Sequence, residues 1–172
     1  MSSIHLGKFE KMNGTEPSVL ARLEEGPWGS VYNFQEILIL AKHMVGYRLP
    51  KGSLLFEQGD RANFVCFVLS GCVEVYKEDA DGQEKKLIAI KAGKSLGEMS
   101  LVDKEPRSAT CRALQDTEVL ILDAEGLALI EEKYPHVALS FVRYLAVEIS
   151  RRLRRTTGTL VRVGMDKDPL ML

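Results

Sequence analysis

The middle of the chain, over residues 46–123, alternates apolar and polar positions with a period of two, which is typical of β-strands. Apolar runs such as residues 64–69, and alternating positions such as Val73 and Val75, are separated by turn sequences rich in glycine and aspartate. We count about eight short strands at regular spacing, with a helical insert near the end. This pattern predicts a mainly β fold with added helices, built on an eight-stranded antiparallel jelly-roll-like barrel.

The first 32 residues are expected to form a loosely built N-terminal arm, because glycines and prolines recur there among mixed polar residues. Asn33 and Glu36 then have the spacing of a capping box, which predicts a helix over about residues 34–45. We therefore place the arm at residues 1–32, the folded domain at residues 33–160 and a tail at residues 161–172.

Helical periodicity returns after Asp123, which is placed to cap a short helix that Pro135 ends or kinks. A longer helix is expected from about residue 136 to residue 160 or slightly beyond, and Gly158 costs it about 1 kcal/mol relative to alanine. One face of this helix has positions spaced alternately by four and three residues, apolar except for one threonine, and they are Val142, Ala146, Ile149, Leu153, Thr156, Leu160 and Val163. This heptad seam is the pattern of paired helices, so we expect a homodimer through residues 142–163.

Composition narrows the class of protein further. A chain of 172 residues with 45% hydrophobic and 27% charged residues is typical of one soluble globular domain, and a net charge of -1 gives no general attraction to nucleic acid or acidic membranes. No apolar run approaches the roughly 20 residues that span a bilayer, and the N-terminus has no signal-peptide core. Cys66, Cys72 and Cys111 lie in strand-like runs without metal-ligand spacing, which indicates buried free thiols in a reducing cytoplasm.

The candidate binding chemistry lies in residues 97–110, which begin with Gly97 and Glu98 and continue through a short helix-like piece. The free N-terminus of a helix favours a small anion, and the planar guanidinium of Arg107 matches two phosphate oxygens at once. An ionised Glu98 accepts hydrogen bonds from sugar hydroxyls. Together these groups suggest a nucleotide site, and the alternative is a surface loop with an incidental acid and arginine.

The histidines argue against an enzyme. His5, His43 and His136 all lie outside the predicted barrel, whereas a metal enzyme of the cupin type needs two or three histidines and an acid inside it. Nucleophilic hydrolysis also lacks a base inside the barrel. We therefore expect a binding module with no catalytic residues and no metal.

The turns and the segment over residues 97–110 resemble those of the cyclic nucleotide-binding domain, as in catabolite-activator-like regulators and the regulatory subunits of protein kinase A. The resemblance covers roughly residues 33–160. The matching motifs are Leu49-Pro-Lys-Gly52, Phe56-x-x-Gly59-Asp60, Phe67-x-x-x-Gly71-x-Val73-x-Val75, Gly97-Glu98-x-Ser100-Leu101 and Pro106-Arg107-Ser108-Ala109-Thr110.

The resemblance implies a role for each matching residue. Glu98 would bind the ribose 2′-hydroxyl and Arg107 the cyclic phosphate, and the N–H groups of Gly97 and Glu98 with the Ser108 hydroxyl would complete the cradle. Apolar residues at the matching positions, which are Val75, Leu87 and Leu96, would line the base and sugar pocket. Position 96 is often phenylalanine in other branches of the family, which changes the shape of the pocket there.

In catabolite-activator-like regulators, the segment matching residues 151–157 meets the purine. Thr156 would reach the base in its own subunit, Thr157 the base bound by the partner, and Arg152 would lie near the nucleotide. The alternative is that the arginines form a solvated helix face and that Thr156 is a tolerated polar residue in the seam. Ser108 favours cAMP, because threonine at this position marks the cGMP-selective kinase sites of the family, although cGMP remains possible.

The chain departs from those regulators after its long helix. Only fourteen residues follow Gly158, too few for a helix-turn-helix domain of at least about 50 residues. We therefore expect no sequence-specific DNA binding. We also expect no membrane partner, because the chain has no apolar run long enough to span a bilayer. The expected function is a cytoplasmic cAMP sensor in signal transduction, which relays a conformational change through its C-terminal helix to an unidentified effector protein. The alternative is a scaffold protein of the same fold that has lost its response to nucleotides.

Overall fold

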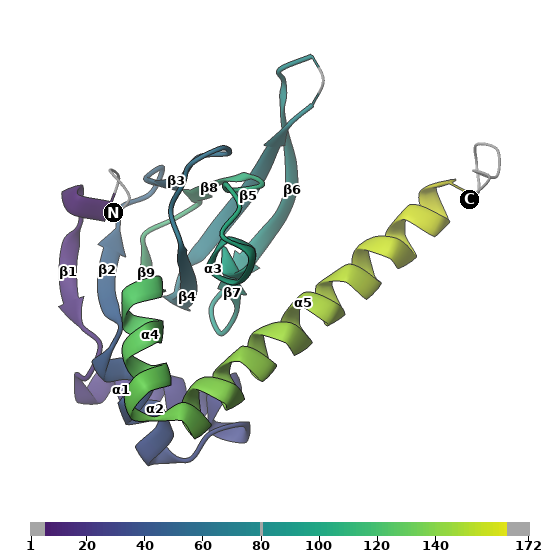
Figure 1. The fold of residues 1–172 in the computed structure, drawn as a ribbon. Coiled ribbons are helices and arrows are strands. Elements are labelled where there is room, and N and C mark those ends of the chain that lie inside the picture. The colour runs from purple at the N-terminus through teal and green to yellow at the C-terminus, as the bar shows by residue number, and fades with distance from the viewer. Residues whose placement is uncertain (1–5, 80, 165–172) are drawn as a thin grey trace.

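Two antiparallel sheets form the centre of the molecule, as the computed structural model shows for residues 6–79 and 81–164 (Figure 1). The five-stranded sheet has the order β1 (Glu10–Asn13), β2 (Val45–Leu49), β9 (Thr117–Asp123), β4 (Phe64–Ser70) and β7 (Ser95–Leu96). The four-stranded sheet has the order β3 (Leu54–Phe56), β8 (Thr110–Ala113), β5 (Cys72–Glu78) and β6 (Glu84–Lys91). The jelly-roll-like fold is confirmed, but the sheets are not closed into a barrel, and the described residues form nine strands.

The strands β4 and β9 lie next to each other and are buried on both faces. Alternate residues of each strand point into two different cores: Cys66 and Ile121 lie between the sheets, whereas Phe67 and Leu120 face the helices. This double burial explains why both strands read as continuous apolar runs rather than as strict alternation.

Two predicted helix starts are confirmed. The Asn33 side chain accepts a hydrogen bond from the Glu36 backbone, and the Glu36 carboxylate accepts one from the Asn33 backbone, at the start of α2 (Phe34–Lys42). Asp123 caps α4 (Ala124–Lys133) by accepting a hydrogen bond from Gly126 N–H. The helix α2 ends three residues earlier than expected, because the chain turns at His43 and Val45 already begins β2.

The expectation of a loosely built arm is wrong for the described residues before Asn33. They form the 3-10 turn η1 (Leu6–Lys8), the strand β1, the helix α1 (Pro17–Glu25) and the 3-10 turn η2 (Pro27–Ser30). Trp28 is buried, with its ring centroid 4.7 Å from that of Phe67 on β4 and 6.3 Å from that of Phe141 on the last helix. This segment therefore fastens the long C-terminal helix to the larger sheet.

The last helix, α5 (Pro135–Gly164), runs through Gly158 and directs its second half away from the sheets (Figure 1). Its first turns are held in the core by buried side chains such as Phe141 and Leu145. The heptad seam lies on a different face of the helix from these buried side chains. Two of its residues, Val142 and Leu153, are exposed, and 65% of the surface of Leu153 is exposed. The side chains of Leu160 and Val163, which complete the seam, lie outside the described residues. The homodimer through this seam stays a prediction.

None of the helices in the described part of the chain is both long enough and apolar enough to cross a membrane. Cys66, Cys72 and Cys111 are buried and free, as the sequence predicts. Burial raises the pKa of the Cys111 thiol to about 12 and raises that of Cys66 as well. Neither thiol is ionised at neutral pH.

Candidate functional site

The candidate site is built around α3 (Glu98–Asp103), a short helix between β7 and β8. Two residues in the left-handed backbone conformation flank it, Gly97 with a φ of 75° before the helix and Lys104 with a φ of 62° after it. Gly97 is required here, because a Cβ at this position would lie 2.6 Å from Arg107 Nη1. The turn at Gly97 therefore makes Glu98 the first residue of the helix and lets Arg107 pack against the turn.

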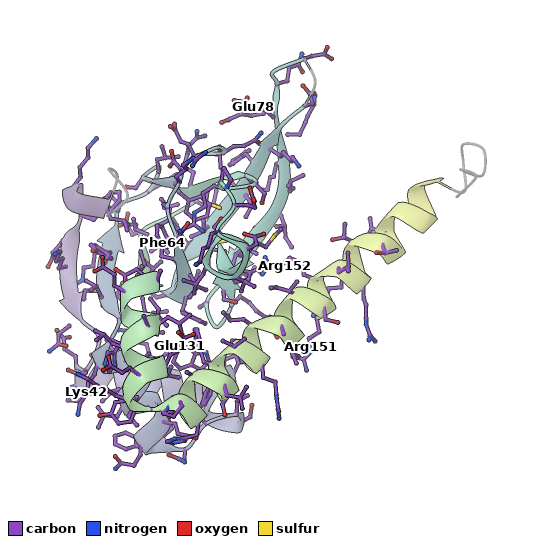
Figure 2. All side chains as sticks on the ribbon, viewed as in Figure 1. Lys42, Phe64, Glu78, Glu131, Arg151 and Arg152 are labelled. Carbon is purple, nitrogen blue, oxygen red and sulfur yellow. The ribbon has the colours of Figure 1, made fainter. Side chains whose placement is uncertain are left out.

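Glu98 is almost completely buried, with 1% of its surface exposed. Its Oε1 accepts a hydrogen bond of 2.7 Å from Nη1 of Arg152, and Nη2 of Arg152 donates to the Ser95 carbonyl oxygen at 2.9 Å. Its Oε2 has no hydrogen-bond partner among the described residues. Arg152 extends from the side of α5 nearest the sheets (Figure 2), so this ion pair joins the candidate site to the long helix.

Arg107 is also buried, with 2% of its surface exposed. Its Nη1 donates to the carbonyl oxygen of Gly97 at 2.7 Å, and its Nη2 donates to that of Phe64 at 2.9 Å. Its Nε has no hydrogen-bond partner in the described part of the chain. Burial lowers the pKa of the guanidinium to about 10, so Arg107 remains a cation at neutral pH. A buried cation with an unpaired N–H is suited to an anionic ligand.

The structure brings four of the predicted residues together, namely Gly97, Glu98, Arg107 and Arg152. Ser108 follows Arg107 on the exposed surface. The roles that we predict for these residues are not tested by their positions.

The predicted base-contacting residues are spread over a wider region. Leu96 lies in the core between the sheets, Val75 is half-buried, and Leu87 is 57% exposed on the hairpin of β5 and β6. Thr156 and Thr157 are exposed on the second half of α5, where each hydroxyl donates to the backbone carbonyl four residues earlier. Both hydroxyls thus bond their own helix, and neither forms a hydrogen bond with the cluster around α3 among the described residues.

The neighbouring arginines of α5 fit the alternative of a solvated face. Arg151 forms an ion pair with Glu148 at 2.9 Å, and Arg154 and Arg155 are exposed. Of these four arginines, Arg152 is the one whose guanidinium bonds residues of the candidate site within the described part of the chain.

Two aromatic residues at the site were given no role by the sequence. The rings of Phe56 and Phe64 both lie with their centroids 4.1 Å from Cζ of Arg107. Phe56 belongs to a matching turn motif, but this motif carries no sign of the contact, because its ring meets an arginine 51 positions later in the chain. The residues come together only when β3, β4 and the segment after α3 are packed.

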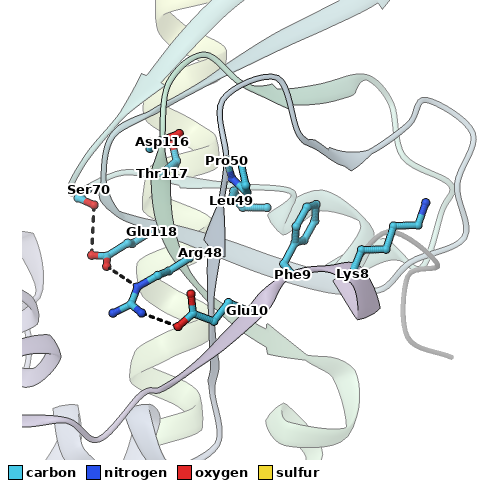
Figure 3. A pocket seen from close by; sticks show the side chains of 10 residues that line it. All are labelled: Lys8, Phe9, Glu10, Arg48, Leu49, Pro50, Ser70, Asp116, Thr117 and Glu118. Carbon is cyan, nitrogen blue, oxygen red and sulfur yellow. Dashed lines mark hydrogen bonds and ion pairs between the residues drawn. The ribbon is translucent and has the colours of Figure 1, made fainter.

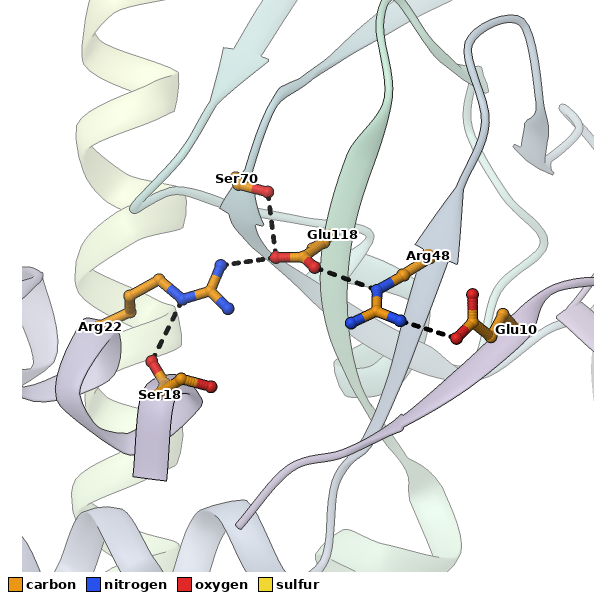
Figure 4. A network of polar contacts seen from close by, with 6 residues as sticks. All are labelled: Glu10, Ser18, Arg22, Arg48, Ser70 and Glu118. Carbon is orange, nitrogen blue, oxygen red and sulfur yellow. Dashed lines mark hydrogen bonds and ion pairs between the residues drawn. The ribbon is translucent and has the colours of Figure 1, made fainter. Parts of the chain in front are cut away.

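A separate cavity of about 640 Å³ lies beside β1 and β2, and no predicted site residue lines it (Figure 3). Phe9, Leu49 and Pro50 form an apolar wall, and Arg48 extends along the opposite side between Glu10 and Glu118. These ion pairs continue to Arg22 on α1, which donates to Glu118 at 2.6 Å (Figure 4). Their arrangement joins β1 and α1 to the centre of the larger sheet.

No group of three or more His, Cys, Asp or Glu side chains in the described residues is arranged to hold a metal ion. Among the residues that the structure describes, the buried side-chain polar atoms without a hydrogen-bond partner belong instead to Ser95, Glu98 and Arg107, all close to α3.

The family model "Cyclic nucleotide-binding domain" matches residues 47–134, about half of the chain. The match runs from β2 through α4 and includes the whole segment from Gly97 to Arg107. The chain therefore belongs to the cyclic nucleotide-binding domain family.

Among curated proteins, the "Cyclic AMP receptor protein" of Thermus thermophilus is 38% identical over 105 residues, which are 61% of this chain and 47% of that protein. A cyclic nucleotide-binding domain from Methylobacillus flagellatus KT has the same fold, with a TM-score of 0.83 at 21% identity, over 99% of this chain and 96% of that one. The c-di-GMP responsive global regulator CLP of Xanthomonas campestris has a TM-score of 0.67 at 25% identity, over 77% and 65%. The chain spans about half the length of the curated relatives that it matches first.

Proposed function

We propose that this chain is a cyclic nucleotide sensor whose ligand is cAMP. One observation carries the proposal: Glu98 and Arg107, both buried at the same turn, each keep a polar atom without a partner. A ribose hydroxyl donates to Glu98 Oε2, and a phosphate oxygen accepts from Arg107 Nε, so one nucleotide satisfies both groups. Ser108 and the named ligand of the Thermus thermophilus relative favour cAMP over cGMP.

The ion pair between Glu98 and Arg152 gives the ligand a direct connection to α5. A ribose that hydrogen-bonds Glu98 changes the environment of the carboxylate that holds Arg152, and so shifts the balance between two positions of the helix. The exposed seam of α5 then pairs with a second copy, and the paired helices pass the change to an effector protein. In this proposal the chain is a cytoplasmic binding module without catalysis and without a metal.

The scaffold without nucleotide response remains the second candidate, and one observation favours it. Both Nη atoms of Arg107 already donate to backbone carbonyls, and Oε1 of Glu98 is already paired. A nucleotide must therefore bind without these groups, or break the hydrogen bonds that they already form. The absence of a DNA-binding role stays a prediction.

A thermal-shift panel separates the two candidates. It compares cAMP, cGMP, c-di-GMP and AMP at equal concentrations on the purified chain. A ligand at 100 times its Kd stabilises the folded state by about 2.7 kcal/mol, and cAMP is expected to give the largest shift. A thermal shift with c-di-GMP alone would show that c-di-GMP, and not cAMP, is the ligand. No shift with any of the four nucleotides would favour the scaffold.

A further inference from the structure

Phe56 and Phe64 form a corner around the Arg107 guanidinium, and we call this pair the aromatic corner. Each ring centroid lies 4.1 Å from Cζ, and the two centroids lie 5.8 Å apart. These distances place the two rings in directions about 90° apart as seen from Cζ, and the ring planes are inclined at 71° to each other, so the rings flank the guanidinium on two sides. An arginine cation within about 6 Å of a ring centroid is attracted by the negative face of the ring.

Backbone groups restrain the guanidinium further. The carbonyl oxygens of Gly97 and Phe64 accept hydrogen bonds from Nη1 and Nη2, so the Phe64 residue holds Arg107 through both its ring and its backbone. The absent side chain of Gly97 makes room, because a Cβ there would meet both Nη1 of Arg107 and the Phe56 ring. The guanidinium is therefore fixed on several sides before any ligand binds, and its Nε is left without a partner.

We propose that Phe56 and Phe64 are positioning residues that hold Arg107 ready for the ligand phosphate, and that the chain discriminates nucleotides from nucleosides through this corner. The inference rests on the proposed function, in which Arg107 binds the phosphate. A long arginine side chain has many rotamers, and fixing it in advance removes that entropic cost from the binding step. The rings also compensate a cation that burial has taken out of water.

Phe67 is a phenylalanine of the same strand that packs in the core and has no contact with Arg107 among the described residues. It is buried like Phe64 and lies three residues further along β4, but its ring faces the other core and packs against Trp28 and Phe141. The variant Phe67→Leu therefore removes a comparable buried ring without touching the aromatic corner, and it is the matched control.

The test measures binding of cAMP and of adenosine, which lacks the phosphate, to the wild type and to Phe56→Leu, Phe64→Leu and Phe67→Leu. Calorimetry reports cAMP, and ligand-detected NMR reports adenosine at millimolar concentration. Phe56→Leu and Phe64→Leu are each expected to weaken cAMP binding about tenfold, with adenosine binding unchanged within about twofold. Phe67→Leu should leave the ratio of the two affinities at its wild-type value.

Two further variants keep the test decisive where a leucine variant does not fold. Phe64→Tyr retains the ring and should retain the wild-type ratio, whereas Arg107→Lys keeps the charge, lacks the planar group and should lose at least about tenfold for cAMP alone. The positioning role is overturned by equal losses for both ligands in the corner variants, or by wild-type cAMP affinity in them. A wild type that binds no nucleotide overturns the proposed function itself, so the two failures are distinguishable.

Discussion

Gly97 and Arg107 restrict each other, and this contact makes a residue-scale prediction. A Cβ at Gly97 would lie 2.6 Å from Arg107 Nη1, whereas a Cβ at Gly52, which has a similar φ of 82°, would meet nothing within 4 Å. Gly97→Ala and Gly52→Ala should therefore both lose about 1–2 kcal/mol of unfolding free energy from backbone strain.

Only Gly97→Ala should also displace the guanidinium, and we expect it to weaken cAMP binding by at least about tenfold. Chemical denaturation and titration calorimetry on both variants measure the two effects. Equal cAMP affinity in the two variants would show that the contact with Arg107 is irrelevant to the ligand.

The sequence was enough to name candidate residues for the site, but not to show which other residues they contact. Glu98 and Arg107 stand in a motif of fixed spacing, so residue type and order were enough to name them as candidates, and the structure places both at one turn. The contacts of Phe56 and Phe64 with Arg107 were missed, because they depend on how β3 and β4 pack around an arginine far along the chain. The partner of Glu98 on α5 was placed near the nucleotide by resemblance, but its ion pair with Glu98 required the structure.

At the scale of the element, the seam of α5 predicts the oligomeric state. Leu153 is 65% exposed and lies in the seam, whereas Val147 is also exposed but lies outside the heptad spacing. Leu153→Asp should convert the dimer to a monomer, because it places two like charges in a paired helix interface. Val147→Asp should remain a dimer. Sedimentation velocity at several concentrations measures both, and a wild-type monomer or a dimeric Leu153→Asp would contradict the assignment.

The carboxylate of Glu118 predicts how stability depends on pH. Hydrogen bonds, first from Arg22 and then from Arg48, hold the pKa of Glu118 below its usual value against the opposing effect of burial. A carboxylate with a lowered pKa contributes stability above its usual pKa, and this contribution disappears as the pH falls through the lowered one. Acid should therefore weaken the ion pairs that join β1 and α1 to the centre of the larger sheet.

Glu118→Gln should lose about 1 kcal/mol of unfolding free energy at neutral pH, and less in acid. Glu10→Gln, which alters a more exposed partner of Arg48, should change stability little at either pH. Urea denaturation between pH 3 and pH 7 gives the two curves. A Glu118→Gln curve parallel to that of the wild type would contradict the role of this carboxylate.

Elements with strong local signals were predicted well. The capping box at Asn33, the cap at Asp123 and the alternation along the strands each act within a few residues of sequence, so they were visible without the fold. The N-terminal segment was misjudged for the opposite reason. Its glycines and prolines suggest a loose arm, but Trp28 is ordered by rings from β4 and α5 that lie far away in the sequence.

At the scale of the whole molecule, the site joins the sheets to the helix that leaves them. Arg107 is held by residues of β3 and β4, and Glu98 is held by Arg152 of α5. The nucleotide that we propose at this turn would therefore contact both parts at once. The second half of α5 lies away from the sheets (Figure 1), where it is accessible to a second copy or to an effector. This arrangement is the physical basis of the proposed sensor.

Titration of the chain with cAMP in a calorimeter, for the wild type and for Arg107→Ala, tests the central claim most directly. The wild type should bind cAMP at one site per chain. Removing the buried guanidinium should cost about 3–5 kcal/mol, which is two to three decades or more in Kd, while Glu98→Ala should cost about 1.5–3 kcal/mol. Near-native affinity for cAMP in Arg107→Ala, or no binding by the wild type, would contradict the account.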